Sequence, residues 1–247
     1  MEFFINLIIC TTKFIIISHE TPLTNAVENH NYEIVKILLD HGVDFSVGSN
    51  NIAALDIAIK SHDDSLALMI AKKIQVVDIV LLVKVIEMNN IPLAKILIPK
   101  CDKIRLDSLV KLAARGNSLE ILMLLIENGA LSQRKPVEPL IIACRYNYIE
   151  IAKVLIQNGV NVNGTKYEKP LIISTQNNFF EISNLLIENG ADVNCCLYKN
   201  NTPLFNACLN NNVELVKLLI EKGAHREIDH NDPLFEALSP DIVNLIQ

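Results

Sequence analysis

The sequence has no tryptophan, and aromatic residues make up only 5% of its 247 residues. Half of the residues are nonetheless hydrophobic, so the interior has to be built mainly from Leu, Ile, Val and Ala. Such side chains suit thin layers of stacked helices, in which a helix is buried on more than one side. The apolar runs at residues 3–10 and 14–17 are too short to span a bilayer, so no membrane partner is expected.

The sequence also lacks any concentration of basic residues. It has 22 Lys and Arg against 28 Asp and Glu, a formal net charge of −6, and neither sign gathers into a basic arm or an acidic tail. Sequence-independent binding to nucleic acids depends on clustered Lys and Arg that face the phosphates. We therefore expect no nucleic-acid partner.

The six cysteines form no C-x-x-C pair and show no disulfide framework. Cys144 and Cys208 fall where a small buried residue is expected in the repeat described below. Cysteines used as small hydrophobic residues indicate a reducing compartment, so a cytoplasmic or nuclear location is predicted. At Cys195 and Cys196, in a polar loop close to Lys199, we expect a pair of exposed thiols rather than a reactive site.

No motif of a known catalytic or cofactor-binding site is present. The sequence contains no phosphate-binding glycine loop, no G-x-S-x-G, no H-E-x-x-H and no EF-hand loop, so we expect neither enzymatic activity nor a cofactor. In the densest polar cluster, residues 225–232, His225, Glu227 and Asp229 would share one face of an extended segment. Their spacing matches no known zinc pattern, which favours a solvated loop over a metal site.

What the sequence does contain is a pattern that recurs roughly every 30 residues. Each strong copy begins with Pro-Leu, has a small residue four positions after the proline, continues with Glu followed by Ile or Leu, and ends in an aliphatic run and a glycine. The strongest copies begin at Pro22, Pro139, Pro170 and Pro203, and their small residues are Ala26, Ala143, Ser174 and Ala207.

Each part of this pattern has a physical reason. Thr can cap a helix and Pro fits its first turn, while the small residue lets two helices approach closely. Aliphatic residues at i, i+1, i+4 and i+5 give the second helix an apolar stripe. Glycine ends that helix because the chain must turn left-handed there. Two short helices cannot bury their own apolar faces, so several units must stack.

The pattern closely resembles the ankyrin repeat, whose T-P-L, E-I-V, L-L-x-x-G and A-D-V-N segments are matched at residues 21–23, 33–35, 38–42 and 191–194. The resemblance implies an all-α solenoid of stacked helix–turn–helix units with short β-hairpin fingers. It covers nearly the whole chain, so we predict a single array over residues 1–247. Its parts are predicted as a partial repeat at 1–20, repeats at 21–52, 53–79, 80–107, 108–137, 138–168, 169–201 and 202–231, and a truncated repeat at 232–247.

Some segments depart from the pattern. The second and third full repeats have Ile74 and Cys101 where glycine is expected, and the finger between these repeats is predicted to be nearly absent. Hydrogen exchange is therefore expected to be fastest around residues 70–105. Residues 2–12 fit the second helix of a partial repeat better than a secretory signal, because Glu2 stands where a signal has positive charge.

The resemblance further implies that a partner binds at the inner face of the first helices and at the finger tips. Several of these positions carry Tyr and Arg, which commonly anchor interfaces, and Lys. Such a set of side chains suits an acidic or phosphorylated segment of the partner. The predicted partner-binding residues are Arg134, Lys135, Arg145, Tyr146, Lys166, Tyr167, Gln176, Tyr198, Lys199 and Arg226.

We therefore predict a monomeric protein–protein interaction scaffold that holds a partner against a rigid concave face. The alternative is a regulatory or assembly-chaperone subunit of a larger enzyme or proteasome-type complex, because the layout resembles that of a proteasome-assembly chaperone. The alternative predicts one stable stoichiometric partner.

Overall fold

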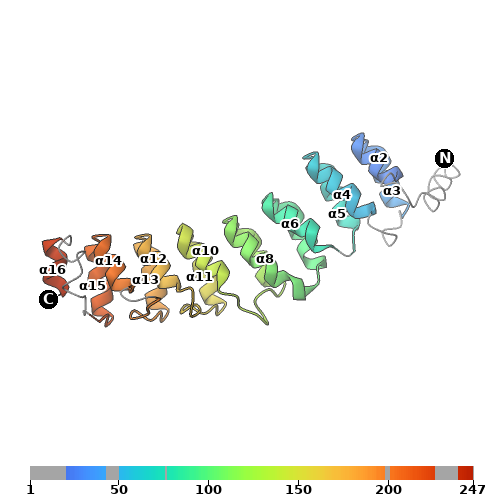
Figure 1. Cartoon of the computed structure of the whole chain (residues 1–247). Coiled ribbons are helices and arrows are strands. Elements are labelled where there is room, and N and C mark those ends of the chain that lie inside the picture. Colours follow the sequence, from blue (N-terminus) through green and yellow to red (C-terminus); the bar gives the residue numbers. More distant parts are fainter. Residues whose placement is uncertain (1–20, 43–49, 76, 198–200, 226–238, 247) are drawn as a thin grey trace. The chain divides into compact units, whose positions relative to one another are not determined.

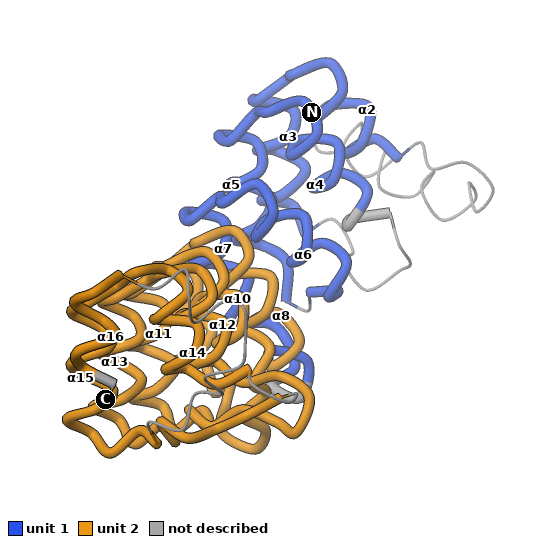
Figure 2. Tube along the Cα trace, turned by 60° about the vertical axis from the view of Figure 1, so that its left-hand side comes forward, with its two compact units in different colours: residues 1–106 blue, residues 107–247 orange. Residues whose placement is uncertain are grey.

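The computed structural model describes residues 21–42, 50–75, 77–197, 201–225 and 239–246. Within these ranges the regular structure is entirely helical, and most helices are short and arranged in antiparallel pairs (Figure 1). The predicted all-α repeat solenoid is confirmed. The chain divides into two compact units, residues 1–106 and 107–247, which Figure 2 shows in different colours.

Unit 1 contains three helix pairs. The first helices of the first two pairs, α2 and α4, pack together, and the second helices form a continuous row in which α3 contacts α5 and α5 contacts α7. The elements are α2 (Pro22–Glu28), α3 (Tyr32–Asp40), α4 (Asn50–Lys60), α5 (Asp64–Lys73), α6 (Ile79–Glu87), α7 (Ile91–Leu97) and the 3₁₀ turn η2 (Ile98–Lys100).

Unit 2 repeats the same two-layer arrangement. The first helices α10, α12 and α14 form one layer, and the second helices α9, α11, α13 and α15 form the other. The elements are α8 (Lys103–Arg115), which begins at the end of unit 1, α9 (Leu119–Glu127), α10 (Glu138–Tyr146), α11 (Ile149–Gln157), α12 (Pro170–Gln176), α13 (Phe180–Glu188), α14 (Pro203–Leu209), α15 (Val213–Glu221) and α16 (Pro240–Ile246).

The Thr-Pro pairs begin helices as predicted. Thr21 caps α2 by accepting a hydrogen bond from the Thr24 N–H, and the Thr24 hydroxyl in turn accepts one from the Thr21 N–H, which makes a capping box. Thr202 caps α14 in the same position by accepting a 3.2 Å bond from the Phe205 N–H. Pro22 and Pro203 occupy the first turns, where the missing N–H is not needed.

The turn between the two helices of a pair is built around the predicted small residue. In α10, for example, the carbonyl of Ala143 accepts a 2.9 Å bond from the Tyr148 N–H, and Asn147 between them has a left-handed backbone with φ 57°. Asn and His tolerate this conformation better than most residues. The same φ, between 51° and 58°, occurs at His30, His62, Asn89, Asn117, Asn147, Asn178 and Asn211.

Terminal glycines end the second helices of unit 2, as predicted. Gly129, Gly159, Gly190 and Gly223 all have positive φ, between 79° and 104°, so each turns the chain left-handed after the helix. The loops that follow contain turns, and no strand is assigned in the described residues of either unit. The expected β-hairpin fingers are therefore not confirmed, although the loops project where fingers were expected.

Asparagine side chains connect neighbouring loops of unit 2. Asn163 accepts a 2.7 Å bond from the Asp192 N–H and donates a 3.2 Å bond to the Gly190 carbonyl. Asn194 makes the corresponding bonds to the His225 N–H and the Gly223 carbonyl, at 2.7 and 3.0 Å. Each loop is thus held by backbone groups of the next, which limits its freedom to move independently.

In unit 1, α5 ends without a glycine. Ile74 has an extended backbone, with φ −65° and ψ 136°. The Nζ atom of Lys100, in η2, donates hydrogen bonds to the carbonyls of Ala71, Lys72 and Ile74 at 2.9, 3.2 and 2.7 Å. A lysine from the next helix pair therefore satisfies carbonyls that a terminal glycine turn would otherwise help to satisfy.

Two further expectations concern the connection between α5 and α6 and the boundaries of the repeats. The connection from Lys73 to Ile79 is short, as predicted, and Pro99 lies in the turn that ends α7. The partial repeat expected at residues 1–20 lies outside the described residues, and the repeat boundaries stay a prediction. In the described ranges, no helix combines the length and the hydropathy needed to cross a membrane.

Candidate functional site

One face of α10 carries the central residues of the site. Glu138, Ile141, Ile142 and Arg145 are spaced i, i+3, i+4 and i+7, which places them along one side of the helix. Ile141 is buried against the core and Ile142 is half-buried, whereas Glu138 and Arg145 are exposed. The face therefore has an apolar floor with one charge of each sign at its two ends.

The neighbouring helix α8 adds two cations to this face. Lys111 and Arg115 are one helical turn apart, so their side chains leave the same side of α8. Lys111 Nζ forms a 3.0 Å ion pair with Glu138 across the two helices. Both partners are about half exposed, at 41% and 58%, and such pairs contribute only about 0–1 kcal/mol to stability. The pair's main effect is to neutralise the Glu138 carboxylate.

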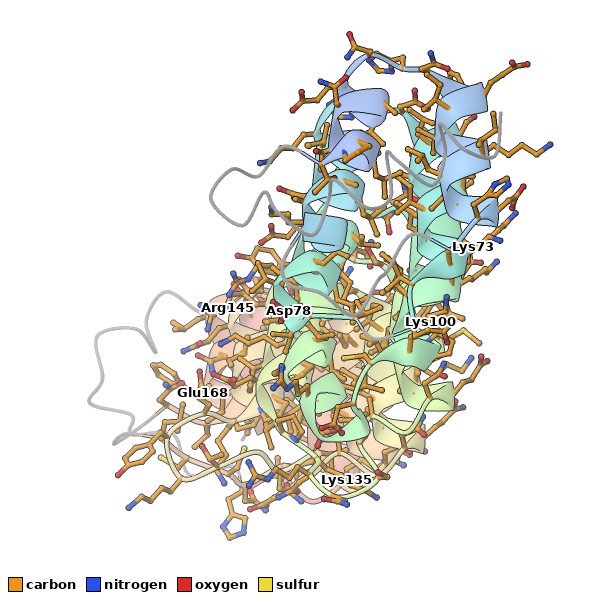
Figure 3. All side chains as sticks on the ribbon, turned by 90° about the vertical axis from the view of Figure 1, so that its right-hand side faces the viewer. Lys73, Asp78, Lys100, Lys135, Arg145 and Glu168 are labelled. Carbon is orange, nitrogen blue, oxygen red and sulfur yellow. The ribbon has the colours of Figure 1, made fainter. Side chains whose placement is uncertain are left out.

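Together these helices and one loop form a hollow of about 290 Å³. Pockets for drug-sized ligands have volumes of about 300–1,000 Å³, so this hollow suits a few side chains of a peptide. Arg145 and Glu168 can be followed in Figure 3, where both lie on the same side of unit 2. The hollow is lined by Lys111, Arg115, Glu138, Ile141, Ile142, Arg145, Tyr146 and Glu168.

The charges in the hollow are only partly neutralised. Within the described residues, neither Arg115 nor Arg145 forms an ion pair, and both side chains are exposed. Glu168, half-buried at the opposite rim, likewise has no ion pair with a described residue. Once Lys111 and Glu138 cancel each other, two guanidinium groups and one carboxylate remain, so the hollow is net positive on a net negative chain.

A stacked pair of tyrosines borders the hollow. The left-handed turn at Asn147 brings the rings of Tyr146 and Tyr148 to a centroid distance of 5.7 Å and an interplanar angle of 25°. Stacking restricts both rings. Tyr146 nevertheless remains 56% exposed, so it offers a fixed aromatic surface next to Arg145. Held aromatic side chains lose little entropy when a partner binds.

The loop after α11 presents two more of the predicted residues, Lys166 and Tyr167, in a tight turn. The Thr165 N–H donates a 2.9 Å bond to the Glu168 carbonyl, and the Thr165 hydroxyl accepts bonds from the Tyr167 and Glu168 N–H groups. Gly164 is required because a Cβ at this position would lie 2.2 Å from the Glu168 carbonyl oxygen. Lys166 lies over the Tyr167 ring, 4.7 Å from its centroid, and Tyr167 is 74% exposed.

The other predicted residues do not all lie at this hollow. Lys135 does not line the hollow (Figure 3). Its Nζ lies beside Gly159, and a Cβ added to Gly159 would be 2.6 Å from that Nζ. Arg134 is exposed in the same loop as Lys135. The Gln176 amide donates a weak 3.4 Å bond to Asn201. Tyr198, Lys199 and Arg226 lie outside the described residues.

The predicted set missed six residues of the hollow, namely the apolar Ile141 and Ile142 and the charged Lys111, Arg115, Glu138 and Glu168. Arg115 occupies the same repeat position as Arg145, two residues after the small residue, and this signal was present in the sequence. Lys111 could have been found from its spacing to Arg115. No local pattern indicates that Glu138 pairs with Lys111 or that Glu168 shares a hollow with Lys111 and Arg115, because both depend on packing between repeats.

The cysteine expectations are partly confirmed. Cys144 and Cys208 are buried beside the small residues, at 0% and 3% exposure. The expected pair of exposed thiols is wrong, because Cys195 is buried and only Cys196 is exposed. The Cys195 N–H bonds to the Asp192 carbonyl, and this turn directs the side chain inward. Burial, with a smaller effect of Asp192, raises the pKa of Cys195 to about 11.

No group of three or more His, Cys, Asp or Glu side chains suited to a metal ion occurs in the residues that the structure describes. The cluster considered from sequence lies mostly outside them. Of its members only His225 is described, and it is exposed, with its backbone N–H bonded to Asn194.

Comparison with known proteins agrees with the repeat pattern. A family model described as "Ankyrin repeats (3 copies)" matches residues 3–79, 81–166, 110–196 and 171–247, which together cover almost the whole chain. No curated protein matches the chain.

Proposed function

We propose that this chain, which belongs to the ankyrin-repeat family, is a scaffold that holds a partner protein against the inner helices of unit 2. Ankyrin repeats are generally protein–protein interaction modules. The observation that carries the proposal for this chain is the hollow between α8 and α10, where arginine side chains that form no ion pair with any described residue, apolar floor residues and a stacked aromatic ring come together. Its action would be to present or cover the partner, with no bond made or broken.

The composition of the hollow supports this role. Arg and Tyr are the residues most often responsible for binding energy at interfaces. Arg145 and Tyr146 are adjacent and exposed on a helix whose other side is packed, so a partner would not have to order the backbone that carries them, and the Tyr146 ring is already held by Tyr148. The Thr165 turn also carries Lys166 and Tyr167, which directly precede Glu168 in the lining of the hollow. These side chains would surround a bound segment rather than a small molecule.

The proposal can be tested by quantitative affinity capture with the whole chain as bait. One variant carries Arg115→Ala, Arg145→Ala, Tyr146→Ala and Tyr167→Ala. A matched control carries Met123→Ala, Lys153→Ala, Glu181→Ala and Lys217→Ala, all exposed residues of second helices. Circular dichroism and thermal melting would establish that all three proteins fold alike.

We expect at least one protein to be captured equally by the original chain and the control, and to be lost with the inner-face variant. Binding of a purified sample of that protein should weaken by a factor of about a hundred or more, since losing even one hot-spot residue costs about 2 kcal/mol or more and the variant removes four interface candidates. Equal capture by all three proteins would contradict binding at this hollow.

A further inference from the structure

The two arginines of the hollow occupy equivalent positions in successive repeats. Arg115 lies two residues after Ala113, and Arg145 lies two residues after Ala143, so each leaves its helix at the same height and in the same direction. A positive charge is therefore repeated with the spacing of the helices. At the corresponding positions farther along unit 2, Gln176 and Leu209 are uncharged. The charged stretch is confined to α8 and α10.

We propose that the hollow binds an acidic segment of the partner in the polyproline II conformation, with two carboxylates three residues apart that contact Arg115 and Arg145. This inference rests on the proposed function and specifies the chemistry and the spacing of the bound segment. Arg binds carboxylates through paired, charge-assisted hydrogen bonds, and each guanidinium here would take one carboxylate.

The spacing of the helices selects the conformation of the segment. Helices that pack side by side have axes about 8–10 Å apart. A polyproline II helix advances about 3.1 Å per residue with three residues per turn, so side chains three apart leave the same side about 9 Å from each other. In a β-strand the side chains on one face are separated by about 6.6 Å or twice that, and neither distance fits the helix spacing.

The remaining residues of the hollow determine which residues of the bound segment fit between its two acids. The half-buried Ile142 and the exposed ring of Tyr146 give an apolar surface beside Arg145. A proline or an aliphatic residue between the acids would contact this surface, and proline also favours the required backbone. The preferred sequence is thus an acid, two residues that include a proline or an aliphatic residue, and a second acid.

The Glu168 carboxylate repels an acidic ligand, so replacing it tests whether the bound segment is acidic or basic. This carboxylate lines the same hollow and has no ion partner among the described residues. An acidic segment that binds beside it meets like-charge repulsion, which lowers affinity and on-rate. Glu168→Gln removes this repulsion with little change of shape, so it should strengthen binding. For a basic ligand the same substitution should weaken binding.

The test uses phage-displayed random linear peptides selected on the full chain, with Lys153→Gln as a control bait. Selected sequences should be enriched in pairs of Asp or Glu three positions apart. For a synthetic peptide of this kind, Arg115→Gln and Arg145→Gln should each weaken binding roughly tenfold, as expected for loss of one charge-assisted pair. Glu168→Gln should strengthen binding, and Lys153→Gln should leave the affinity unchanged.

Three results would overturn this inference or part of it, and they differ in their meaning for the proposed function. If selected peptides lack the acid pair but still lose binding with Tyr146→Ala, the hollow is a binding site and the acidic chemistry is wrong. If peptides with the acid pair bind equally well to the arginine variants, they bind elsewhere on the chain. Selection of peptides that carry one acid, or acids two apart, would contradict the polyproline II spacing.

Discussion

At the scale of single residues, burial separates chemically similar side chains. Cys195 and Cys196 are neighbours in the sequence, yet one thiol is buried and the other is exposed. Burial raises the pKa of Cys208 to about 11 and raises that of Cys144 further. Because the thiolate is the reactive form, burial reduces both the access of a reagent and the amount of nucleophile present.

We therefore predict that Cys196 is alkylated much faster than Cys101, Cys144, Cys195 and Cys208 in the native protein at neutral pH. Mass-spectrometric peptide mapping after brief exposure to iodoacetamide would measure each site separately. Denatured protein provides the control, because all of these thiols should then react at similar rates. Equal labelling of Cys195 and Cys196 in the native protein would contradict the buried position of Cys195.

At the scale of elements, the end of α5 shows how one helix depends on another. The ammonium of Lys100 lies at the carbonyl end of α5, where a positive charge is favoured by the helix dipole. Burial lowers the pKa of Lys100. Figure 3 shows Lys100 and Lys73, the last residue of α5.

Lys100→Met keeps much of the aliphatic stem and removes the three hydrogen bonds. We expect it to destabilise the protein by roughly 1–2 kcal/mol, the upper range for a cation at a helix end, and to speed hydrogen exchange at the end of α5. Urea denaturation and exchange mass spectrometry would measure these effects. Lys36→Met, at an exposed position of α3, is the comparison, and an equal loss of stability in both variants would contradict a specific role for Lys100.

Fast hydrogen exchange around residues 70–105 stays a prediction, but the contacts of Lys100 change what we expect at the end of α5. If the missing glycine were uncompensated, exchange at the end of α5 would be rapid in the original chain. With Lys100 in place, we expect rapid exchange there mainly in the Lys100→Met variant.

At the scale of the whole molecule, acid should affect unit 1 through two aspartates. Burial opposes ionisation of Asp63, but hydrogen bonds from Tyr32 and His30, at 2.6 and 2.9 Å, outweigh it and lower the pKa of Asp63. Burial likewise opposes ionisation of Asp56, and its contacts with Lys60 and Lys84 lower its pKa. The bonds of Asp63 to Tyr32 and His30, and of Asp56 to Lys84, connect successive helix pairs of unit 1, whereas Asp56 and Lys60 both lie in α4.

A lowered pKa stabilises the folded state at pH values above the unfolded pKa, which is about 3.9 for Asp, and this contribution is lost as the pH falls through the folded value. We predict that the melting temperature falls as the pH drops below about 4, the unfolded pKa of Asp. Asp63→Asn should be less stable at neutral pH and should lose less stability on acidification. Thermal melting across this range is the measurement, and parallel curves for both proteins would contradict a role for Asp63.

Much of the fold could be predicted because the repeat is encoded locally. Pro22, Ala26 and Gly42 show the start, the close contact and the end of a repeat within one short segment, and the helix class follows from them. The charged contacts could not be predicted in this way. Lys100 reaches carbonyls more than 25 residues earlier in the chain, and Glu168 lines a hollow together with Lys111 and Arg115 of the preceding repeat. Such contacts depend on how repeats stack, which no single segment records.

The lysine that completes α5 also bears on how arrays of this kind can be recombined. Repeats that carry their own terminal glycine, such as those ending at Gly159 and Gly190, can in principle be exchanged or duplicated as separate modules. The segment that contains α6, α7 and η2 is different. Removing it would also remove the Lys100 ammonium, which donates hydrogen bonds to the carbonyls at the end of α5 in the preceding repeat. In a library of shuffled repeats, α4–α5 and α6–η2 should therefore survive only when they are inherited together.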